Sequence, residues 1–565
     1  MRTVIHLTRL SPKKISLRGH ALLREPLLNK GSAFSTGERK AFGLDGLLPY
    51  RVLDMERQAK RIYAMLDRYP DAMGKYVALA ALQDRNEHLF FYLLQQHLEE
   101  FLPIVYTPTI GLATKRFSQV FQRGRGAWIT PDQQGAIAET LQRAAQGRDI
   151  RLIVATDNES ILGIGDQGAG GIKISIGKLA LYTAAAGINP ASVLPISLDV
   201  GTQNQALLDQ TGYLGWPHAR LRGTEYAAFV DEFVAAVRQL FPHALIQWED
   251  FRKDNALRIM DRYRDEVLSF NDDIQGTGAV ALAGMLSAQR VHGRPLAGER
   301  ILIVGAGAAG LGISRQIKVA LAGAGLTGED LQHAVAALDS QGLLVDTRVG
   351  DSYKAEMAWT QARAKALQLD GSGIGLLDVC RAFRPTVLIG TSGQRNAFSE
   401  AVVREIASTV ERPVILPLSN PTDLSEAVPA DLYAWSDGRA LVAAGSPFPP
   451  VEYAGRTYQV GQGNNAFIFP GIGHGAILSG AASITDSMFY AGAKALARMV
   501  TDDELAGGSL YPAVDRLREA SVEVAVAVIR DAAESGMIEP ISDLEIQNLL
   551  DAGTWSPAYR EYIPN

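Results

Sequence analysis

The 565-residue sequence has only one cysteine, Cys380, so it can form neither an internal disulfide bond nor a cysteine-based metal cluster. It has no excess of positive charge either, and its formal net charge of −6 argues against a nucleic-acid-binding surface. No apolar run reaches membrane-spanning length, and the basic segment 1–19 lacks the apolar core of a signal peptide. We therefore expect a soluble, untargeted, cytoplasmic protein that binds neither nucleic acid nor membranes.

The composition is that of an ordinary folded protein, with 47% hydrophobic and 21% charged residues. The length indicates roughly three domains. Residues 23–122 have mostly helical periodicity, with amphipathic stretches at 51–69 and 75–102, the second ending at Pro103. Farther along, apolar strands alternate with helical stretches, which predicts an α/β fold with parallel sheets. The expected strands of the later part are residues 299–304, 333–338, 386–389, 413–417 and 441–443.

Two acidic pairs, Glu249-Asp250 and Asp272-Asp273, stand at the two ends of a segment whose residues 255–263 have helical spacing. Such a helix would return the chain and bring the pairs together. Flanking aromatic residues would desolvate the carboxylates, and like charges raise one another's pKa unless a cation neutralises them. Oxygen-only ligands favour Mg²⁺ or Mn²⁺. The alternative is two unrelated surface pairs that cap helices.

Two segments satisfy the dinucleotide-binding glycine pattern, Gly163 to Gly168 and Gly305 to Gly310. Each follows an apolar strand, and a later strand ends in an aspartate, Asp199 or Asp339 respectively. Spacing does not choose between them. Context favours the second, because residues 311–321 begin a helix at once, which would place a helix N-terminus against a pyrophosphate.

Lys178 opens an apolar helix expected at residues 178–186, directly after Gly177. The positive end of the helix dipole, burial and a nearby metal would each lower the pKa of the lysine and suit it as a base. A lysine that reaches solvent along its aliphatic stem is the alternative. Tyr106 lies between Pro103 and Pro108, which predict an extended segment around it. On residue type alone, a tyrosine beside apolar residues is most often a core residue whose hydroxyl group is hydrogen-bonded.

Nine motifs in order along nearly the whole chain resemble the malic enzyme family. They are LLNKGSAFS from Leu27, IVYTPTIG from Ile104, ILGIGDQG from Ile161, IGKLALYTAAAGI from Ile176, LDVGT from Leu198, WEDF from Trp248, FNDDIQGT from Phe270, LSNPT from Leu418 and GQGNNAFIFPG from Gly461. The resemblance implies oxidative decarboxylation of L-malate to pyruvate and CO₂ with reduction of NAD. It also implies a metal ion, Mg²⁺ or Mn²⁺, and a homodimer or homotetramer.

The resemblance also assigns roles to individual residues. It implies Glu249, Asp250 and Asp273 as metal ligands, Lys178 as general base, Tyr106 as general acid and Asp272 as a further catalytic carboxylate. The implied NAD-binding residues are Gly305, Gly307, Ala308, Ala309, Gly310, Asp339, Asn420 and Asn464. Asn420 and Asn465 are the implied substrate contacts.

The predicted architecture is a helical N-terminal region, a parallel-sheet substrate domain and a Rossmann-type NAD-binding domain. The expected boundaries are residues 1–130 for the helical domain, 131–278 with 467–540 for the substrate and metal domain, 279–466 for the NAD domain and 541–565 for a tail.

One position departs from the family pattern. Malic enzymes place an arginine that grips a substrate carboxylate in a segment like Glu-Arg-Ile-Leu-Gly, where this chain has Ser160. Serine cannot form that two-bond clamp. Malolactic enzymes, which turn L-malate into L-lactate and CO₂ with bound NAD, also lack the arginine and are the alternative function. Another arginine or Lys173 would have to hold the carboxylate. A metal-free amino-acid dehydrogenase and a non-catalytic NAD-binding regulator are more distant alternatives.

Overall fold

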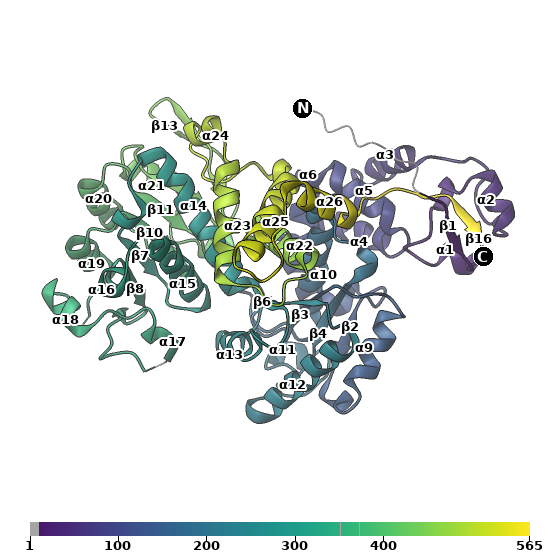
Figure 1. The fold of residues 1–565 in the computed structure, drawn as a ribbon, viewed down its shortest axis with the longest axis horizontal. Coiled ribbons are helices and arrows are strands. Elements are labelled where there is room, and N and C mark those ends of the chain that lie inside the picture. The colour runs from purple at the N-terminus through teal and green to yellow at the C-terminus, as the bar shows by residue number, and fades with distance from the viewer. Residues whose placement is uncertain (1–10, 351, 372) are drawn as a thin grey trace.

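The computed structural model describes residues 11–350, 352–371 and 373–565. Residues 1–10 of the basic N-terminal segment thus lie outside the described residues. The described chain forms two large sheets wrapped in helices, with a bundle of C-terminal helices between them, and two small two-stranded sheets (Figure 1). Within these residues, every helix is too short or too polar to cross a membrane.

The N-terminal region is helical, as predicted, but its long helices are shorter than expected. Its helices include α3 (Met55–Leu66), α4 (Ala72–Gln83), α5 (Glu87–Gln96), α6 (Leu98–Val105), α7 (Thr109–Lys115) and α8 (Phe117–Val120). The predicted stretch 75–102 is divided because the Asn86 side chain caps a new helix by accepting a hydrogen bond from the Leu89 backbone. Pro103 lies inside α6 instead of ending it, and the chain becomes extended only at Tyr106.

The first sheet has five parallel strands in the order β2-β4-β3-β5-β6. The strands are β2 (Ala127–Ile129), β3 (Leu152–Thr156), β4 (Val193–Leu198), β5 (Leu245–Trp248) and β6 (Ser269–Asn271), covered by α9 (Ile137–Ala145), α10 (Ile172–Leu181), α12 (Gly223–Leu240) and α13 (Lys253–Tyr263). Their residues are almost all buried, as expected for a sheet with both faces covered. Trp248 pairs with Asn271 in the register, so the residues after β5 and β6 emerge together at one edge.

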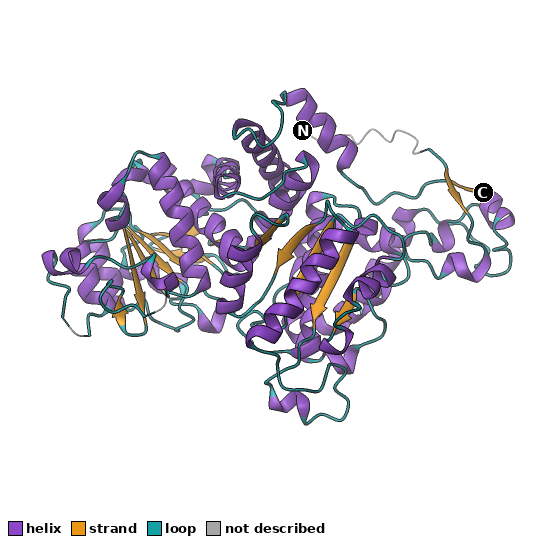
Figure 2. Cartoon of the chain, turned by 60° about the horizontal axis from the view of Figure 1, so that its bottom comes forward, coloured by secondary structure: helices purple, strands orange, loops and turns teal. Residues whose placement is uncertain are grey.

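The second sheet has seven strands in the order β15-β12-β11-β10-β7-β8-β9, with β9 antiparallel to β8 and the other pairings parallel. Its strands are β7 (Ile301–Val304), β8 (Val335–Asp339), β9 (Gly342–Leu343), β10 (Val387–Gly390), β11 (Val414–Pro417), β12 (Leu441–Ala444) and β15 (Gly461–Gln462). Helices on this sheet include α15 (Ala308–Gly323), α16 (Gly328–His333), α19 (Leu376–Phe383), α20 (Glu400–Thr409) and α21 (Pro429–Trp435). The five strands predicted from the sequence are confirmed. Figure 2 shows the strands of the two sheets as separate fans.

Helices α14 (Thr277–His292), α22 (Phe469–Ser479), α23 (Asp486–Met499) and α25 (Leu517–Glu534) pack between the two sheets (Figure 1). Glycines let two of them approach closely, since a Cβ at Gly471 would lie 2.7 Å from the Ser521 carbonyl oxygen on α25. The end of the chain returns to its beginning, because β16 (Tyr562–Pro564) pairs with β1 (Lys13–Ile15). The predicted α/β fold class is confirmed, and the packed C-terminal helices fix how the two sheets face each other.

Candidate active site

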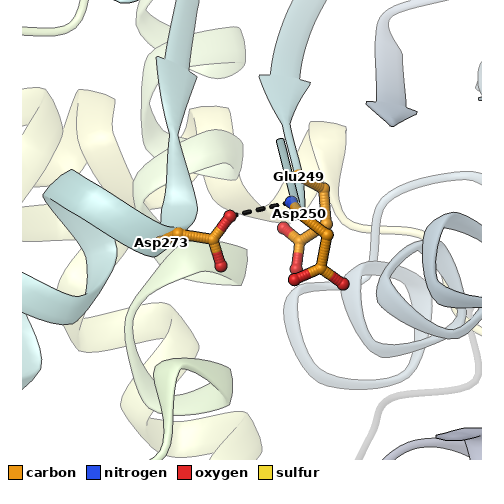
Figure 3. Close-up of side chains that lie close together, drawn as sticks. All are labelled: Glu249, Asp250 and Asp273. Atoms are coloured by element: carbon orange, nitrogen blue, oxygen red, sulfur yellow. Dashed lines mark hydrogen bonds between the residues drawn. The ribbon is translucent and has the colours of Figure 1, made fainter. Parts of the chain in front are cut away.

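Four carboxylates meet where two neighbouring strands of the first sheet end. Glu249 and Asp250 follow β5, and Asp272 and Asp273 begin a π-helical turn, η6 (Asp272–Gly276), directly after β6. In Figure 3 the side chains of Glu249, Asp250 and Asp273 point toward one another, and each contributes an oxygen atom within 4.8 Å of the others. The Asp273 carboxylate also accepts a 2.8 Å hydrogen bond from the Asp250 backbone. Helix α13 between the two pairs returns the chain, so the predicted convergence of the two pairs is confirmed.

Lys178 reaches the same cluster from a helix of the same domain. Its Nζ lies 2.9 Å from Glu249 Oε1 and donates a hydrogen bond to Asp272 Oδ2. Its position in the helix differs from the prediction. Residues Gly168–Gly171 already form a 3₁₀ turn and α10 begins at Ile172, so Lys178 lies in the last turn. The predicted effect of the positive helix end on this lysine was therefore wrong.

The charges of the cluster are unbalanced. Burial and the Asp273 charge raise the pKa of Asp250 well above its usual range, and burial and the Asp272 charge raise the pKa of Asp273 to about 6. Burial lowers the pKa of Lys178, but the charges of Asp272 and Glu249 outweigh it and raise that pKa well above its usual value. The pKa lowering predicted for the lysine is thus reversed by its carboxylate partners.

A cation would complete this arrangement. Two buried carboxylate oxygens, Asp250 Oδ2 and Asp272 Oδ1, have no hydrogen-bond partner, and a buried charge without a partner is costly. The three converging carboxylates, Glu249, Asp250 and Asp273, offer oxygen atoms only, which Mg²⁺ and Mn²⁺ prefer. These residues fit the predicted divalent metal.

Two residues behind the cluster were missed in the sequence. Gln247 donates a 2.8 Å hydrogen bond to Glu249 Oε2 and accepts one from the Tyr182 hydroxyl group. Both positions carried a signal, because Gln247 shares a strand face with Glu249, and Tyr182 comes one helical turn after Lys178. The two side chains orient Glu249 toward the lysine.

Tyr106 lies beside the lysine. Lys178 Nζ is 5.6 Å from the centre of the Tyr106 ring, and the tyrosine is 5% exposed. Burial raises the pKa of Tyr106, so its phenol stays protonated at neutral pH. The structure therefore brings together an amine, a phenol and four carboxylates that are far apart in the sequence.

The predicted asparagines lie on the side of the second sheet. Asn465 Nδ2 donates to Asp272 Oδ2 at 3.0 Å and to Thr277 Oγ1 at 3.0 Å, which connects it directly to the cluster. Asn420 accepts a 2.7 Å hydrogen bond from Ser446, and a Cβ at Gly163 would lie 3.3 Å from its carbonyl oxygen. The side chain of Asn464 accepts a hydrogen bond from the Ala466 backbone, within its own turn. Of the three, only Asn465 is hydrogen-bonded to the acidic cluster.

The second glycine loop has the geometry of a dinucleotide site. Gly305 has a φ of +116°, and a Cβ at Gly310 would lie 2.0 Å from the Gly305 carbonyl oxygen. A Cβ at Gly307 would meet nothing within 4 Å, so this residue borders open space at the N-terminus of α15, which begins with Ala308 and Ala309. A phosphate fits there. Asp339 ends β8 but is engaged by Arg348 at 3.0 Å and Lys354 at 2.9 Å.

The structure separates the two residues considered for the second substrate carboxylate. Ser160 lies at the cluster and is exposed, and its backbone donates a 3.0 Å hydrogen bond to the Asp250 carbonyl oxygen. Lys173 lines a different cavity with Tyr76, Arg123 and Arg125, and its Nζ lies 5.8 Å from the Tyr76 ring centre. Burial lowers the pKa of Lys173. Lys173 is therefore excluded from the acidic cluster.

Comparisons with known proteins agree with this geometry. Residues 83–264 match the family model described as "Malic enzyme, N-terminal domain", and residues 274–533 match "Malic enzyme, NAD binding domain". The chain is 48% identical over 550 residues to NAD-dependent malic enzyme 3 of Bacillus subtilis, which covers 96% of this chain and 97% of that protein. It is 44% identical over 552 residues to NAD-dependent malic enzyme of Sodalis glossinidius, with 98% of each chain covered.

Solved structures show the same fold. The malic enzyme of Entamoeba histolytica superposes with a TM-score of 0.55 at 21% identity, covering 90% of each chain. That of Pyrococcus horikoshii gives 0.53 at 23% identity, covering 80% of this chain and 88% of that one. With two family models that together span most of its length and close relatives aligned nearly end to end, the chain belongs to the malic enzyme family.

Proposed function

We propose that this enzyme catalyses the metal-dependent oxidative decarboxylation of L-malate to pyruvate and CO₂ with reduction of NAD. The observation that carries the proposal is the buried contact of Lys178 with Asp272 and Glu249, next to Tyr106 and the three converging carboxylates. The names of the relatives support NAD as cofactor, as does the open space at Gly307. Family membership favours this function over an amino-acid dehydrogenase or a non-catalytic regulator.

The metal and NAD would be held by different parts of the site. When bound at Glu249, Asp250 and Asp273, Mg²⁺ or Mn²⁺ would supply Lewis-acid polarisation of the 2-hydroxyl group and offset the charge that raises the Lys178 pKa, while NAD bound at the Gly305 loop would supply the hydride acceptor. The protein residues then have the proton transfers to perform.

Lys178 is the proposed base that takes the proton of the malate 2-hydroxyl group. Its position is held from two sides by Asp272 and Glu249, and Gln247 holds Glu249 in turn. Asp272 is itself held by Asn465, so this carboxylate positions the amine and accepts part of its charge. The second proton transfer, to C3 after CO₂ has left, falls to Tyr106, whose phenol burial keeps protonated. In this proposal Lys178 accepts a proton in the first transfer and Tyr106 donates one in the second.

The malolactic reaction is the second candidate because Ser160 stands where malic enzymes carry an arginine. The deciding experiment incubates the protein with L-malate, NAD and Mn²⁺, records NADH absorbance and assays pyruvate and lactate. Equimolar NADH and pyruvate support oxidative decarboxylation, whereas lactate without net NADH supports the alternative.

EDTA should abolish either reaction, and added Mn²⁺ should restore it. Activity that is unchanged by EDTA would contradict the metal site.

We further infer a homodimer or homotetramer, because oligomers are typical of the family that the motifs resemble. A cytoplasmic location is our inference from the single cysteine, because one cysteine cannot form an internal disulfide bond and such bonds are rare in the reducing cytoplasm. The proposed domain boundaries, 1–130, 131–278 with 467–540, 279–466 and 541–565, place the base and the metal ligands in one domain and the glycine loop in the next. Light scattering of the purified protein measures the assembly.

A further inference from the structure

Malate carries a second carboxylate that the acidic cluster repels. If the proposed function holds, the metal would bind malate through its C1 carboxylate and 2-hydroxyl group. The distal carboxylate of malate would then need a separate cation nearby. Ser160 is neutral, and Lys173 lies in another cavity. An arginine close to Ser160 is therefore required, since a guanidinium group matches a carboxylate with two parallel bonds.

Three arginines surround Glu159, the residue before Ser160, and two of them are already engaged. Arg220 is fully buried and binds Asp166 through two nitrogen atoms, at 2.7 and 3.0 Å, and the Asp157 carbonyl oxygen at 2.6 Å. Arg222 forms two 2.6 Å hydrogen bonds with the Glu159 carboxylate. Each guanidinium group could turn to a substrate only by giving up short contacts with a largely buried carboxylate.

Arg252 is different because its contacts are loose. Its guanidinium nitrogens lie 3.7 Å from Glu159 and 3.5 Å from Asp254, both beyond a good hydrogen bond, and its side chain is 45% exposed. Such exposed, poorly aligned pairs contribute little to stability. The guanidinium group is thus held near Glu159 by charge but remains available to another carboxylate.

The position of Arg252 suits the distal carboxylate of a substrate bound at the cluster. Arg252 follows Asp250 by two residues, and the Asp250 carbonyl oxygen accepts the Ser160 backbone hydrogen bond, so Arg252 and Ser160 flank the same metal ligand. The next residue, Lys253, donates a 2.7 Å hydrogen bond to Tyr353 of the second sheet's domain. The beginning of α13, where Arg252 is the N-cap residue, therefore contacts the domain of the second sheet, the domain that holds the glycine loop at Gly305.

We propose that Arg252 binds the distal carboxylate of the dicarboxylate substrate. It would take over the role of the arginine that malic enzymes carry at the position of Ser160. Residues that follow strand β5 would then bind both partners: Glu249 and Asp250 the metal ion, and Arg252 the distal carboxylate. Glu159 keeps the guanidinium group in reach while the site is empty.

The test compares Arg252→Ala and Arg252→Lys with the wild type and with Arg262→Ala, a matched control. Arg262 lies on the same helix with a 53% exposed side chain, and it pairs with Asp231. With saturating Mn²⁺ and NAD, R252A should raise the KM for L-malate about 10- to 100-fold, as expected for a lost charge-assisted bond. R252K should lie between R252A and wild type, and R262A should match the wild type.

Inhibition by oxalate distinguishes loss of the contact between Arg252 and the distal carboxylate from disruption of the whole substrate site. Oxalate can chelate the cation but has no distal carboxylate, so its inhibition constant should change less than threefold in R252A. A KM for malate that stays unchanged, or an oxalate constant that rises in parallel with it, would overturn the proposal. The double variant Ser160→Arg/Arg252→Ala should recover most of the lost malate affinity, and failure to recover any of it would also count against the clamp. Absence of malate turnover in the wild type would instead refute the proposed function.

Discussion

Two loops of this enzyme share the same glycine spacing but differ in where the helix begins: α10 begins after the last glycine of the first loop, whereas α15 begins before Gly310, the last glycine of the second. The chain after Gly168 passes through a 3₁₀ turn before α10 begins at Ile172, and α10 then carries Lys178 into the acidic cluster. After Gly307 the chain enters α15 at once, and a Cβ at Gly307 would meet nothing within 4 Å, so the N-terminus of this helix borders open space. The glycine spacing therefore indicates a strand-turn-helix connection in both loops. The residue at which the helix begins decides whether an anion can bind at the N-terminus of that helix.

The aspartates at the ends of the next strands differ in the same way. Asp199, after β4, is 2% exposed, has one oxygen without a partner and accepts a 2.8 Å hydrogen bond from the Trp216 backbone. Asp339, at the end of β8, is held by two cations at the edge of its sheet. The first is thus a buried carboxylate without a cationic partner at hydrogen-bond distance among the described residues, whereas the second is partly exposed and paired with two cations.

Substitution of the lysine after the first loop should have the largest effect. Lys178→Ala should lower malate turnover by roughly 10³-fold or more, because the proposed base is removed. NAD binding should stay unchanged, since the cofactor site belongs to the other loop. Initial rates of NADH formation and a fluorescence titration with NADH measure the two properties. Lys173→Ala, on the same helix but in another cavity, is the control and should stay within a few-fold of wild type.

Substitution in the second loop should affect the cofactor alone. Gly307→Ala adds a Cβ into open space, so the melting temperature should not change, while the KM for NAD should rise roughly 10- to 100-fold because backbone and pyrophosphate must approach closely. Gly310→Ala is the contrasting variant, because its Cβ would meet the Gly305 carbonyl oxygen at 2.0 Å and should lower the melting temperature. An unchanged KM for NAD in G307A would assign the cofactor elsewhere.

Asp339 should control the choice between NAD and NADP. Asp339→Asn removes the carboxylate proposed to face the ribose and releases Arg348 and Lys354, which could then meet a 2′-phosphate. We expect kcat/KM for NADP relative to NAD to rise about tenfold. Steady-state rates with both cofactors measure the ratio, and a ratio that stays at the wild-type value would remove Asp339 from the ribose site.

Asp199 should have the smallest effect, visible only as a pH dependence of stability. Burial raises its pKa to about 6, above the unfolded value of about 3.9, so the folded state binds more protons between these limits. Stability should therefore fall as pH rises from 4 through 6, by at most about 3 kcal/mol. Asp199→Asn removes this term and keeps an acceptor for Trp216. Its melting temperature relative to wild type should rise by a few degrees between pH 5 and 7.5, and parallel curves would contradict the raised pKa.

Local patterns in the sequence predicted much of the fold. The buried strands, the helix directly after Gly310 and the helix between the acidic pairs all follow from neighbouring residues and are confirmed. The failures come from residues whose local signals were overridden. Pro103 lies within α6, and the glycines after Gly168 are already helical, so Lys178 lies inside a helical segment that runs from Ile172 through a π-helical turn at Tyr182–Ala186, not at its beginning. Packing of these segments against neighbouring helices outweighed the local preferences there.

The sequence by itself determined which residues were available: two acidic pairs, two glycine loops, one lysine in an apolar helix and a serine in place of an arginine. Only the tertiary structure decided that Lys178 meets Asp272 and Glu249, that Lys173 lies in a separate cavity and that Arg252 remains loosely held. The physical reason is range. Helix and strand formation depend on residues a few positions apart, whereas the charge that sets the pKa of Lys178 comes from carboxylates more than seventy positions away, placed by strand order and register.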